Sequence, residues 1–403
     1  MSEHASLVAR LIAVQRFLAR HEALWKPRPF TERYLAWETT YPALATWLRQ
    51  RSLAEAEEAA AFTADQVAPA PMPALAAEAA WLAALEPMPC VPLAAAPARL
   101  DRDVPGRKWQ QVEAFARHLG FAARTRHWVD WCGGKGHLGR RLVQAGQQVT
   151  CLEFDPALIH AGQTLSDHHH LPVRHCLQNV LGHDVALQAW DTPVALHACG
   201  DLHVRLLHLA AERGCAQLAI APCCYNRTQA THYVPLSKAA KAQPLVLSRE
   251  DLGLPANEAV TAGARERRQR DVSMARRLGF DLLQRQVRGQ DIYLPTPSVP
   301  VSWLSASFAD YCLHLAHLKG IELRPNEDWA AWEAQGWARL AQVRNLERVR
   351  NLFRRPLELW LVLDRAVFLQ EQGYRVRVGT FCEPRLTPRN LLILAENNLA
   401  TCG

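Results

Sequence analysis

The sequence lacks any apolar run long enough to span a bilayer, which excludes a protein built on transmembrane helices. Its first residues, MSEHASLVARL, also lack the charged and apolar regions of a secretory signal peptide. The eleven cysteines therefore predict reduced thiols in a cytoplasmic protein rather than a disulfide framework. No Cys-x-x-Cys pair is present, so the cysteine spacing gives no support for a zinc finger or ribbon.

The 403 residues leave room for one large or two ordinary domains, and an apolar content of 49% is typical of a globular protein. The formal charge of +7 permits a polyanionic partner without requiring one.

One stretch, Trp128–Gly139 (WVDWCGGKGHLG), predicts a short strand, a tight glycine turn and the first turn of a helix. The glycines are spaced as Gly134-x-Gly136-x-x-Gly139. Because glycine has no Cβ, this spacing lets the chain turn sharply and lets a ligand approach the backbone. A nucleotide-type ligand would lie where the helix exposes its free N–H groups.

A second strand, Gln148–Asp155, follows the helix and carries Glu153 near its end. A carboxylate about 20 residues after the glycines is where a ribose diol would be bound. Dinucleotides and S-adenosylmethionine both offer that diol. Asp130 favours S-adenosylmethionine, because a carboxylate entering the loop suits a cationic amino group and would repel a pyrophosphate. A dehydrogenase is therefore the least favoured enzyme class.

Further strands are predicted over Val173–Val180, Pro193–Ala198 and Gln217–Ala221, with helices between them. This alternation predicts right-handed crossovers and a parallel sheet, whose ligands bind at the carboxyl ends of the strands. Three turns, CGGKG, HACGDL and PCCYN, are expected at those ends. Asn179 ends the third strand, at a position that usually reads the adenine in a cofactor fold of this type.

Side chains in these turns are the candidate catalytic groups. His197 could act as a base or could be satisfied within its strand. Asp201 could act on the acceptor or cap the helix that follows it. Tyr225 could stack on a planar acceptor, with Asn226 as a hydrogen-bond partner.

Cys223 and Cys224 could be nucleophiles, metal ligands or small buried residues, and a zinc site would need partners such as Cys199 and His197. The sequence favours no metal there. The run His168–His170 is interpreted as a solvated loop, because three adjacent histidines cannot all face one metal.

The rest of the chain is predicted to be largely helical. We expect a helical region at 1–66, a Pro/Ala-rich linker at 67–105 and a domain at 106–403 with a helical insertion at about 227–370. The insertion contains ARERRQRDVSMARR and WARLAQVRNLERVRNLFRR, which could bind phosphates or form solvated faces. Tyr374–Cys382 and Asn390–Glu396 predict a β-hairpin at the sheet edge.

Four motifs in order, DWCGGKGHLGRRL, LHACGDL, APCCYN and a late TPRN, resemble the family around methyltransferase-like protein 25. Related patterns occur in the glutathione-S-transferase-C-terminal-domain-containing protein and, more distantly, in a tRNA 2′-O-methyltransferase family. The resemblance covers about Lys108 to Ala400 and does not extend to the first hundred residues.

The resemblance implies an α/β, Rossmann-like class I fold that uses S-adenosylmethionine. It implies that Gly134 and Gly136 form the cofactor loop, with Asp130 before it, Glu153 on the ribose and Asn179 on the adenine.

The chain departs from the family pattern at three positions. Cys132 replaces the usual first glycine of the loop, and Asn179 stands where an acid is common. Lys135 adds a charge to the loop that could pair with Asp130 or with the methionine carboxylate.

The sequence thus predicts an S-adenosylmethionine-dependent methyltransferase with a macromolecular substrate, RNA (rRNA or tRNA) before protein. A protein methyltransferase and an adaptor that binds S-adenosylmethionine without transferring methyl remain open alternatives. Neither the acceptor atom nor the oligomeric state follows from the sequence.

Overall fold

The computed structural model describes residues 6–58, 62–63, 65–102, 104–256, 263–324 and 326–397. By its contacts the chain divides into two compact units. The sheet unit comprises Met1–Ala19, Leu82–Glu258 and Pro356–Gly403, and the helical unit comprises Arg20–Trp81 and Ala259–Arg355. The domain boundaries expected at 1–66, 67–105 and 106–403 stay a prediction.

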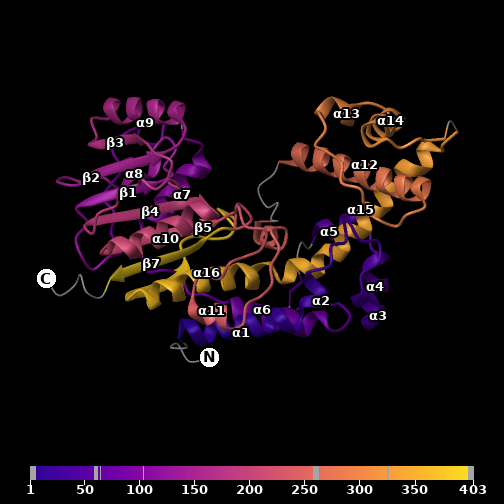
Figure 1. The fold of residues 1–403 in the computed structure, drawn as a ribbon, viewed down its shortest axis with the longest axis horizontal. Coiled ribbons are helices and arrows are strands. Elements are labelled where there is room, and N and C mark those ends of the chain that lie inside the picture. The colour runs from indigo at the N-terminus through magenta and orange to yellow at the C-terminus, as the bar shows by residue number, and fades with distance from the viewer. Residues whose placement is uncertain are drawn as a thin grey trace. The chain divides into compact units, whose positions relative to one another are not determined.

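The sheet unit is built on a seven-stranded sheet in the order β3-β2-β1-β4-β5-β7-β6 (Figure 1). The first five strands are parallel, and β7 is antiparallel to both β5 and β6. This arrangement confirms the predicted parallel sheet and the C-terminal hairpin. The strands are β1 (His127–Trp131), β2 (Gln148–Glu153), β3 (Val173–Leu177), β4 (Asp191–Cys199), β5 (Gln217–Cys223), β6 (Tyr374–Thr380) and β7 (Leu391–Asn397).

Helices cover this sheet because its central strands are apolar on both faces, and every residue of β5 is buried. One core cluster joins strand residues such as Val149 and Leu394 to α7 (Gly106–Ala116) and α8 (His137–Leu142). The other helices of this unit are α9 (Pro156–His168), α10 (Asp201–Arg213), α11 (Lys238–Ala242), η1 (Asp251–Ala256) and α16 (Arg354–Glu371), and α1 (Leu7–Arg20) lies in it up to Ala19.

The apolar helix α16, at the end of the expected helical insertion, is buried from Pro356 to Leu369. Asp364 lies on it with no exposed surface. Its carboxylate accepts hydrogen bonds from the Tyr233 hydroxyl, the Leu236 N–H and both the N–H and hydroxyl of Ser237, at 2.6 to 2.8 Å. These four bonds fasten the segment after β5 to α16.

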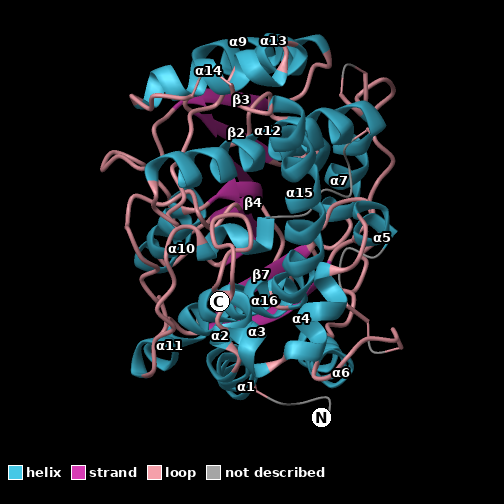
Figure 2. Cartoon of the chain, turned by 90° about the vertical axis from the view of Figure 1, so that its right-hand side faces the viewer, coloured by secondary structure: helices cyan, strands magenta, loops and turns pink. Residues whose placement is uncertain are grey.

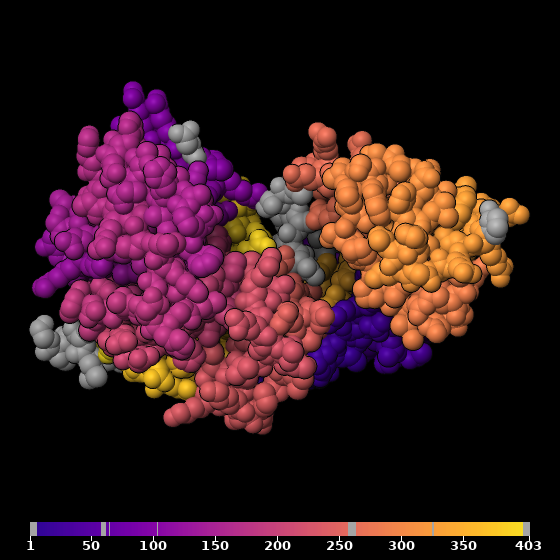
Figure 3. All heavy atoms as spheres, turned by 45° about the horizontal axis from the view of Figure 1, so that its top comes forward, coloured from indigo at the N-terminus to yellow at the C-terminus, as the bar shows by residue number. Residues whose placement is uncertain are grey.

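The helical unit is organised around the pair α12 and α15, which pack on each other. They approach closely at Gly336, where an added Cβ would lie 2.4 Å from the Ala275 carbonyl oxygen. Figure 2 shows the helices of the chain in cyan, and the orange surface in Figure 3 comes from the segment that holds α13 to α15. The helices of this unit are α2 (Glu22–Trp25), α3 (Trp37–Thr40), α4 (Pro42–Arg49), α5 (Leu53–Glu58), α6 (Met72–Ala83, up to Trp81), α12 (Ala264–Arg288), α13 (Val301–Ser305), α14 (Phe308–Lys319) and α15 (Trp329–Leu352).

Several arginines of α15 are interior groups, neither phosphate ligands nor a solvated face. Arg339 is 7% exposed and donates to the carbonyls of Pro29 and Glu32 at 2.5 and 2.7 Å. Arg350 is 6% exposed and donates to the Trp25 carbonyl at 2.8 Å. Buried backbone carbonyls that lack backbone partners require such donors. The sequence analysis did not consider this role for the arginines.

Two smaller expectations need correction. Within the helical region expected at 1–66, the apolar residues of Tyr34–Leu48 recur at helical spacing, yet the segment is not one helix, because α3 ends at Thr40 and Pro42 begins α4. In the run His168–His170, the first histidine is the last residue of α9 rather than part of a loop. Within the residues that the structure describes, no helix is both long enough and apolar enough to cross a bilayer.

Candidate active site

The glycine loop lies where β1 ends and α8 begins, as the sequence predicts. Cys132, Gly134 and Gly136 all have positive φ, at 55°, 58° and 68°. A Cβ at Gly136 would lie 2.4 Å from the His175 ring, whereas a Cβ at Gly134 would meet nothing within 4 Å. Gly136 therefore lets the loop pack on β3, and Gly134 faces open space where a ligand can approach the backbone.

Hydrogen bonds of the side chains of Asp130 and Arg140 hold the backbone around this loop in place. Asp130 is 2% exposed, and its Oδ2 accepts the Gly139 N–H at 2.9 Å. Burial raises the pKa of Asp130 to about 6. Arg140 donates from Nη1 to the Lys135 carbonyl at 2.6 Å. The contacts of Asp130 thus support the loop, and its predicted contact with the methionine amino group stays a prediction.

Lys135 is exposed at the tip of the loop. Among the described residues no ion pair joins Lys135 to the buried Asp130, and the expected pairing of the two stays a prediction. The methionine carboxylate remains the partner to test.

Glu153 ends β2 directly across from the loop. Its Oε2 accepts the Gly134 N–H at 2.9 Å, and its Oε1 accepts the Phe154 and Asp155 N–H groups at 2.8 and 3.1 Å. The carboxylate is half-buried and lies beside the open space at Gly134. A ribose diol would have to bind at this carboxylate.

Phe154, which the sequence analysis missed, is 69% exposed beside Glu153. A large exposed aromatic ring next to the acid expected to bind ribose offers a face for a planar base. The signal was present in the sequence as an aromatic residue directly after the predicted acid.

Asn179 is exposed in the loop two residues beyond the end of β3. Its Oδ1 accepts the Leu181 N–H at 3.1 Å, which shapes the turn. The residue therefore lies at a carboxyl strand end, where the predicted adenine contact would require it.

His197 lies on an irregularity of β4, with φ of 65° and a register shift between Leu196 and Cys199. Its Nε2 lies 3.1 Å from Gln111 Oε1 on α7, and its buried Nδ1 has no hydrogen-bond partner among the described residues. Burial lowers the pKa of His197 to about 4, and the charge of Arg389 adds to this effect. The imidazole is therefore neutral near pH 7, and it is a weaker base than a free histidine.

Asp201 does not cap α10, because Gly200 occupies the cap position and no side chain caps it. Its Oδ2 instead accepts the Gln229 N–H at 2.8 Å, and its own N–H donates to the Arg227 carbonyl at 3.0 Å. Asp201 thus ties the start of α10 to the loop after PCCYN.

Tyr225 is 4% exposed, and its ring lies 4.9 Å from the Arg365 guanidinium and 5.9 Å from the His203 ring. In this structure the ring packs against protein groups instead of offering a face to an acceptor. Asn226 beside it is half-buried. A role for either residue in acceptor binding stays a prediction.

The three turns converge as expected. Gly200 N–H donates to the Cys223 carbonyl at 3.1 Å, and a Cβ at Gly200 would lie 1.9 Å from the Arg227 carbonyl oxygen. HACGDL and PCCYN are therefore in direct contact. Trp131, at the end of β1 before the glycine loop, donates from Nε1 to the Leu202 carbonyl at 2.9 Å, which brings the third turn to the same place.

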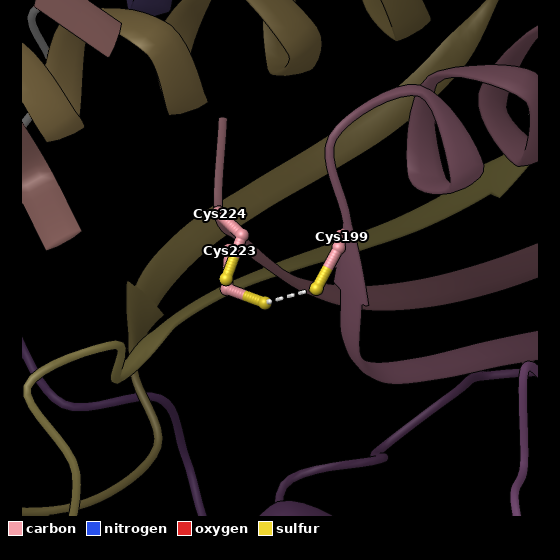
Figure 4. Close-up of side chains that lie close together, drawn as sticks. All are labelled: Cys199, Cys223 and Cys224. Atoms are coloured by element: carbon pink, nitrogen blue, oxygen red, sulfur yellow. Dashed lines mark hydrogen bonds between the residues drawn. The ribbon is translucent and has the colours of Figure 1, made fainter. Parts of the chain in front are cut away.

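Cys199, Cys223 and Cys224 form a cluster at this point (Figure 4). Their Sγ atoms all lie within 4.8 Å of one another, and those of Cys199 and Cys223 are 3.8 Å apart. The thiols of Cys199 and Cys223 and the charge of Arg389 lower the pKa of Cys224. Sequence reasoning considered these cysteines but did not expect all three to meet.

Two basic groups also lie near the site, and the sequence analysis missed the first of them. Lys108, exposed on α7, interacts electrostatically with Asp130 and His197. Arg389, in the TPRN motif, acts on His197 and Cys224. The TPRN motif thus lies near the carboxyl ends of the strands.

A family profile described as a methyltransferase domain matches residues 107–231. The matched segment runs from α7 through β1 to β5 and past the PCCYN turn. The chain carries a methyltransferase domain. The strand order and glycine loop of this domain are those of class I S-adenosylmethionine-dependent methyltransferases.

Solved methyltransferases match parts of the chain at low identity. Magnesium protoporphyrin IX methyltransferase from Synechocystis, with bound SAH, is 17% identical over 32% of this chain and 61% of its own, with a TM-score of 0.25. An S-adenosylmethionine-dependent methyltransferase from Clostridium acetobutylicum is 14% identical over 30% and 52%, with a TM-score of 0.23. An rRNA methylase from Streptococcus thermophilus is 14% identical over 29% and 70%, with a TM-score of 0.22. No curated protein sequence matches the chain.

Proposed function

We propose that this protein transfers a methyl group from S-adenosylmethionine to RNA in the cytoplasm. The observation that carries the proposal is the loop at Gly134, which leaves open space beside the Glu153 carboxylate at the carboxyl ends of β1 and β2. The four motifs support a relationship to the family around methyltransferase-like protein 25.

The residues around the loop fit this cofactor. Gly134 would allow close approach of the donor, Glu153 would accept a hydrogen bond from the ribose hydroxyls, and Phe154 would offer its ring to the adenine. Asn179 would bind the adenine amino group through its amide. Asp130 holds the loop through Gly139 and, as a carboxylate above pH 6, would attract the methionine ammonium group.

When bound, S-adenosylmethionine supplies an electrophilic methyl group. The chain has to align the acceptor with that methyl and, for a hydroxyl or amine, receive its proton. His197 suits the second task, because it is neutral near pH 7 and its Nδ1 has no partner within the described chain. Gln111 acts as a positioning residue by fixing Nε2 of that ring. Asp201 would hold the acceptor-side loop through Gln229.

RNA is favoured over protein by the start of α12. Arg265, Arg267 and Arg268 are all exposed there, within one helical turn. Such a cluster suits a phosphate backbone, and the resemblance to a tRNA-modifying family points the same way. The buried arginines of α15 do not contribute to this surface.

The alternative of a cofactor-binding adaptor rests on one observation. The Asp130 carboxylate is occupied by Gly139, so the loop could bind the donor without orienting its methyl group. A protein methyltransferase is the other alternative. It differs from the first proposal only in its acceptor, which is protein instead of RNA.

The experiment is transfer of radiolabelled methyl from S-adenosylmethionine into extract of cells that lack this protein. We expect label that nuclease releases and protease does not, and mass spectrometry of nucleosides then identifies the modified base or ribose. Label released only by protease would replace RNA with protein. Donor binding without any transfer would establish the adaptor.

A further inference from the structure

The cysteine cluster has the donor set of a metal site. Cys199 ends β4, Cys223 ends the neighbouring strand β5, and Cys224 follows it (Figure 4). Cys199 and Cys223 are register partners across the two parallel strands, so the backbone itself holds their side chains side by side. The irregularity in β4 before Cys199, at His197, brings this register about.

The distances between the sulfur atoms suit tetrahedral zinc. With Zn–S bonds of about 2.3 Å, two thiolates of a tetrahedral site lie about 3.8 Å apart. The Sγ atoms of Cys199 and Cys223 are 3.8 Å apart, and all three sulfur atoms lie within 4.8 Å of one another.

The surroundings suit a cluster of net negative charge. Three thiolates around Zn²⁺ carry one excess negative charge, which needs a cation nearby. Arg389 is half-buried and acts electrostatically on Cys224. The buried Nδ1 of the nearby His197 has no hydrogen-bond partner among the described residues.

We propose that Cys199, Cys223 and Cys224 bind one Zn²⁺ ion at the carboxyl ends of β4 and β5. Three protein thiolates leave one tetrahedral position open, which is the arrangement of sites that take an external ligand. Nothing in the proposal depends on the acceptor being RNA or on donor binding, so it can fail or succeed separately from the proposed function.

The main rival is a disulfide between Cys199 and Cys223, since parallel register partners can approach closely enough for one. A disulfide would join two sulfur atoms and leave Cys224 alone, whereas zinc uses all three. Counting the cysteines that a bound metal protects therefore separates the two.

The test uses the full chain, stripped of metal by a chelator under reducing conditions and titrated with Zn²⁺ or with Co²⁺ as a coloured probe. We expect one ion per chain and, for Co²⁺, the strong charge-transfer absorption of thiolate ligands. Cys199→Ser and Cys224→Ser should each weaken binding about 100-fold or more. Cys176→Ser on β3, outside the cluster, is the matched control and should leave affinity unchanged.

Circular dichroism of each variant checks that it is folded. A second measurement needs no variant: alkylation of the wild-type chain with and without Zn²⁺, mapped by mass spectrometry, should show Cys199, Cys223 and Cys224 protected together. Three results would overturn the proposal. Zinc binding could survive both cluster variants, or zinc could protect other cysteines instead. The third is a Cys199–Cys223 disulfide that persists under reducing conditions with metal present.

Discussion

Each compact unit buries charged side chains that pair with backbone groups, and two carboxylates of one unit can be compared with two arginines of the other. In the sheet unit, Asp130 accepts a backbone N–H at the start of α8, and Asp364 accepts two backbone N–H groups of a loop. In the helical unit, Arg339 and Arg350 donate to the carbonyls of loops. In each case the side chain satisfies backbone groups that secondary structure leaves unpaired.

The difference shows that a charge in the sequence does not by itself mark a ligand surface. The arginine-rich segments look equally basic, yet Arg265, Arg267 and Arg268 of α12 are exposed while Arg339 and Arg350 of α15 are buried. Only the exposed group is available to a polyanion. The comparison can be tested by removing one charge at a time in each unit.

The largest effect is expected for Asp364→Ala in the sheet unit. Loss of a buried carboxylate leaves the donors of Leu236 and Ser237 without their acceptor. We expect a loss of about 3–5 kcal/mol in the free energy of unfolding, measured by urea denaturation. Glu212→Ala on the exposed side of α10 is the control and should change stability by less than about 0.5 kcal/mol.

In the helical unit, Arg339→Met should cost about 2–4 kcal/mol, because two loop carbonyls lose their donor. Arg267→Ala is the matched control on the exposed start of α12 and should cost less than about 0.5 kcal/mol. Equal losses for the two arginines, read from urea denaturation, would remove the distinction between buried and exposed basic residues.

A smaller effect is expected in the pH dependence of Asp130. Its pKa is about 6 in the folded chain and lower when unfolded, so the folded state holds its proton to higher pH. Its contribution to stability is therefore greatest at low pH and is lost as the pH rises through 6. Relative to Asp130→Asn, the wild-type chain should lose about 2 kcal/mol of unfolding free energy between pH 4 and pH 7.

A constant difference between the two chains over that pH range would mean that Asp130 is not a buried acid of raised pKa.

The smallest effect concerns RNA affinity. Arg267→Ala and Arg268→Ala should each lower the slope of log K against log salt by about 1, with a few-fold loss of affinity at low salt. Arg213→Ala, an exposed arginine of α10, is the control. Filter binding at several salt concentrations measures the slopes. Absence of binding to bulk RNA at low salt would remove the support for an RNA substrate.

Much of the fold follows from local sequence. The apolar runs predict all seven strands within a few residues, and the glycine spacing places the loop at the end of β1. The start of β4 was missed because Asp191 looks like a turn residue, whereas it bonds to His127 across the sheet at 2.7 Å. Contacts of that kind join distant residues and leave no periodicity in the sequence.

The candidate site was predicted less completely for the same reason. The positions of Gly134, Glu153 and Asn179 follow from motif spacing along one strand–turn–helix unit. The surroundings of Tyr225 do not, because Arg365 reaches its ring from a helix far along the chain. The meeting of Cys199 with Cys223 depends on strand register, which the sequence does not reveal.

The central claim is that S-adenosylmethionine binds over Gly134 with its ribose held by Glu153. Isothermal calorimetry of S-adenosylmethionine with the wild-type chain, Gly134→Val and Glu153→Ala tests it directly. We predict binding to the wild-type chain and none measurable to either variant, while circular dichroism shows both variants folded. Unchanged affinity in the two variants would contradict the account.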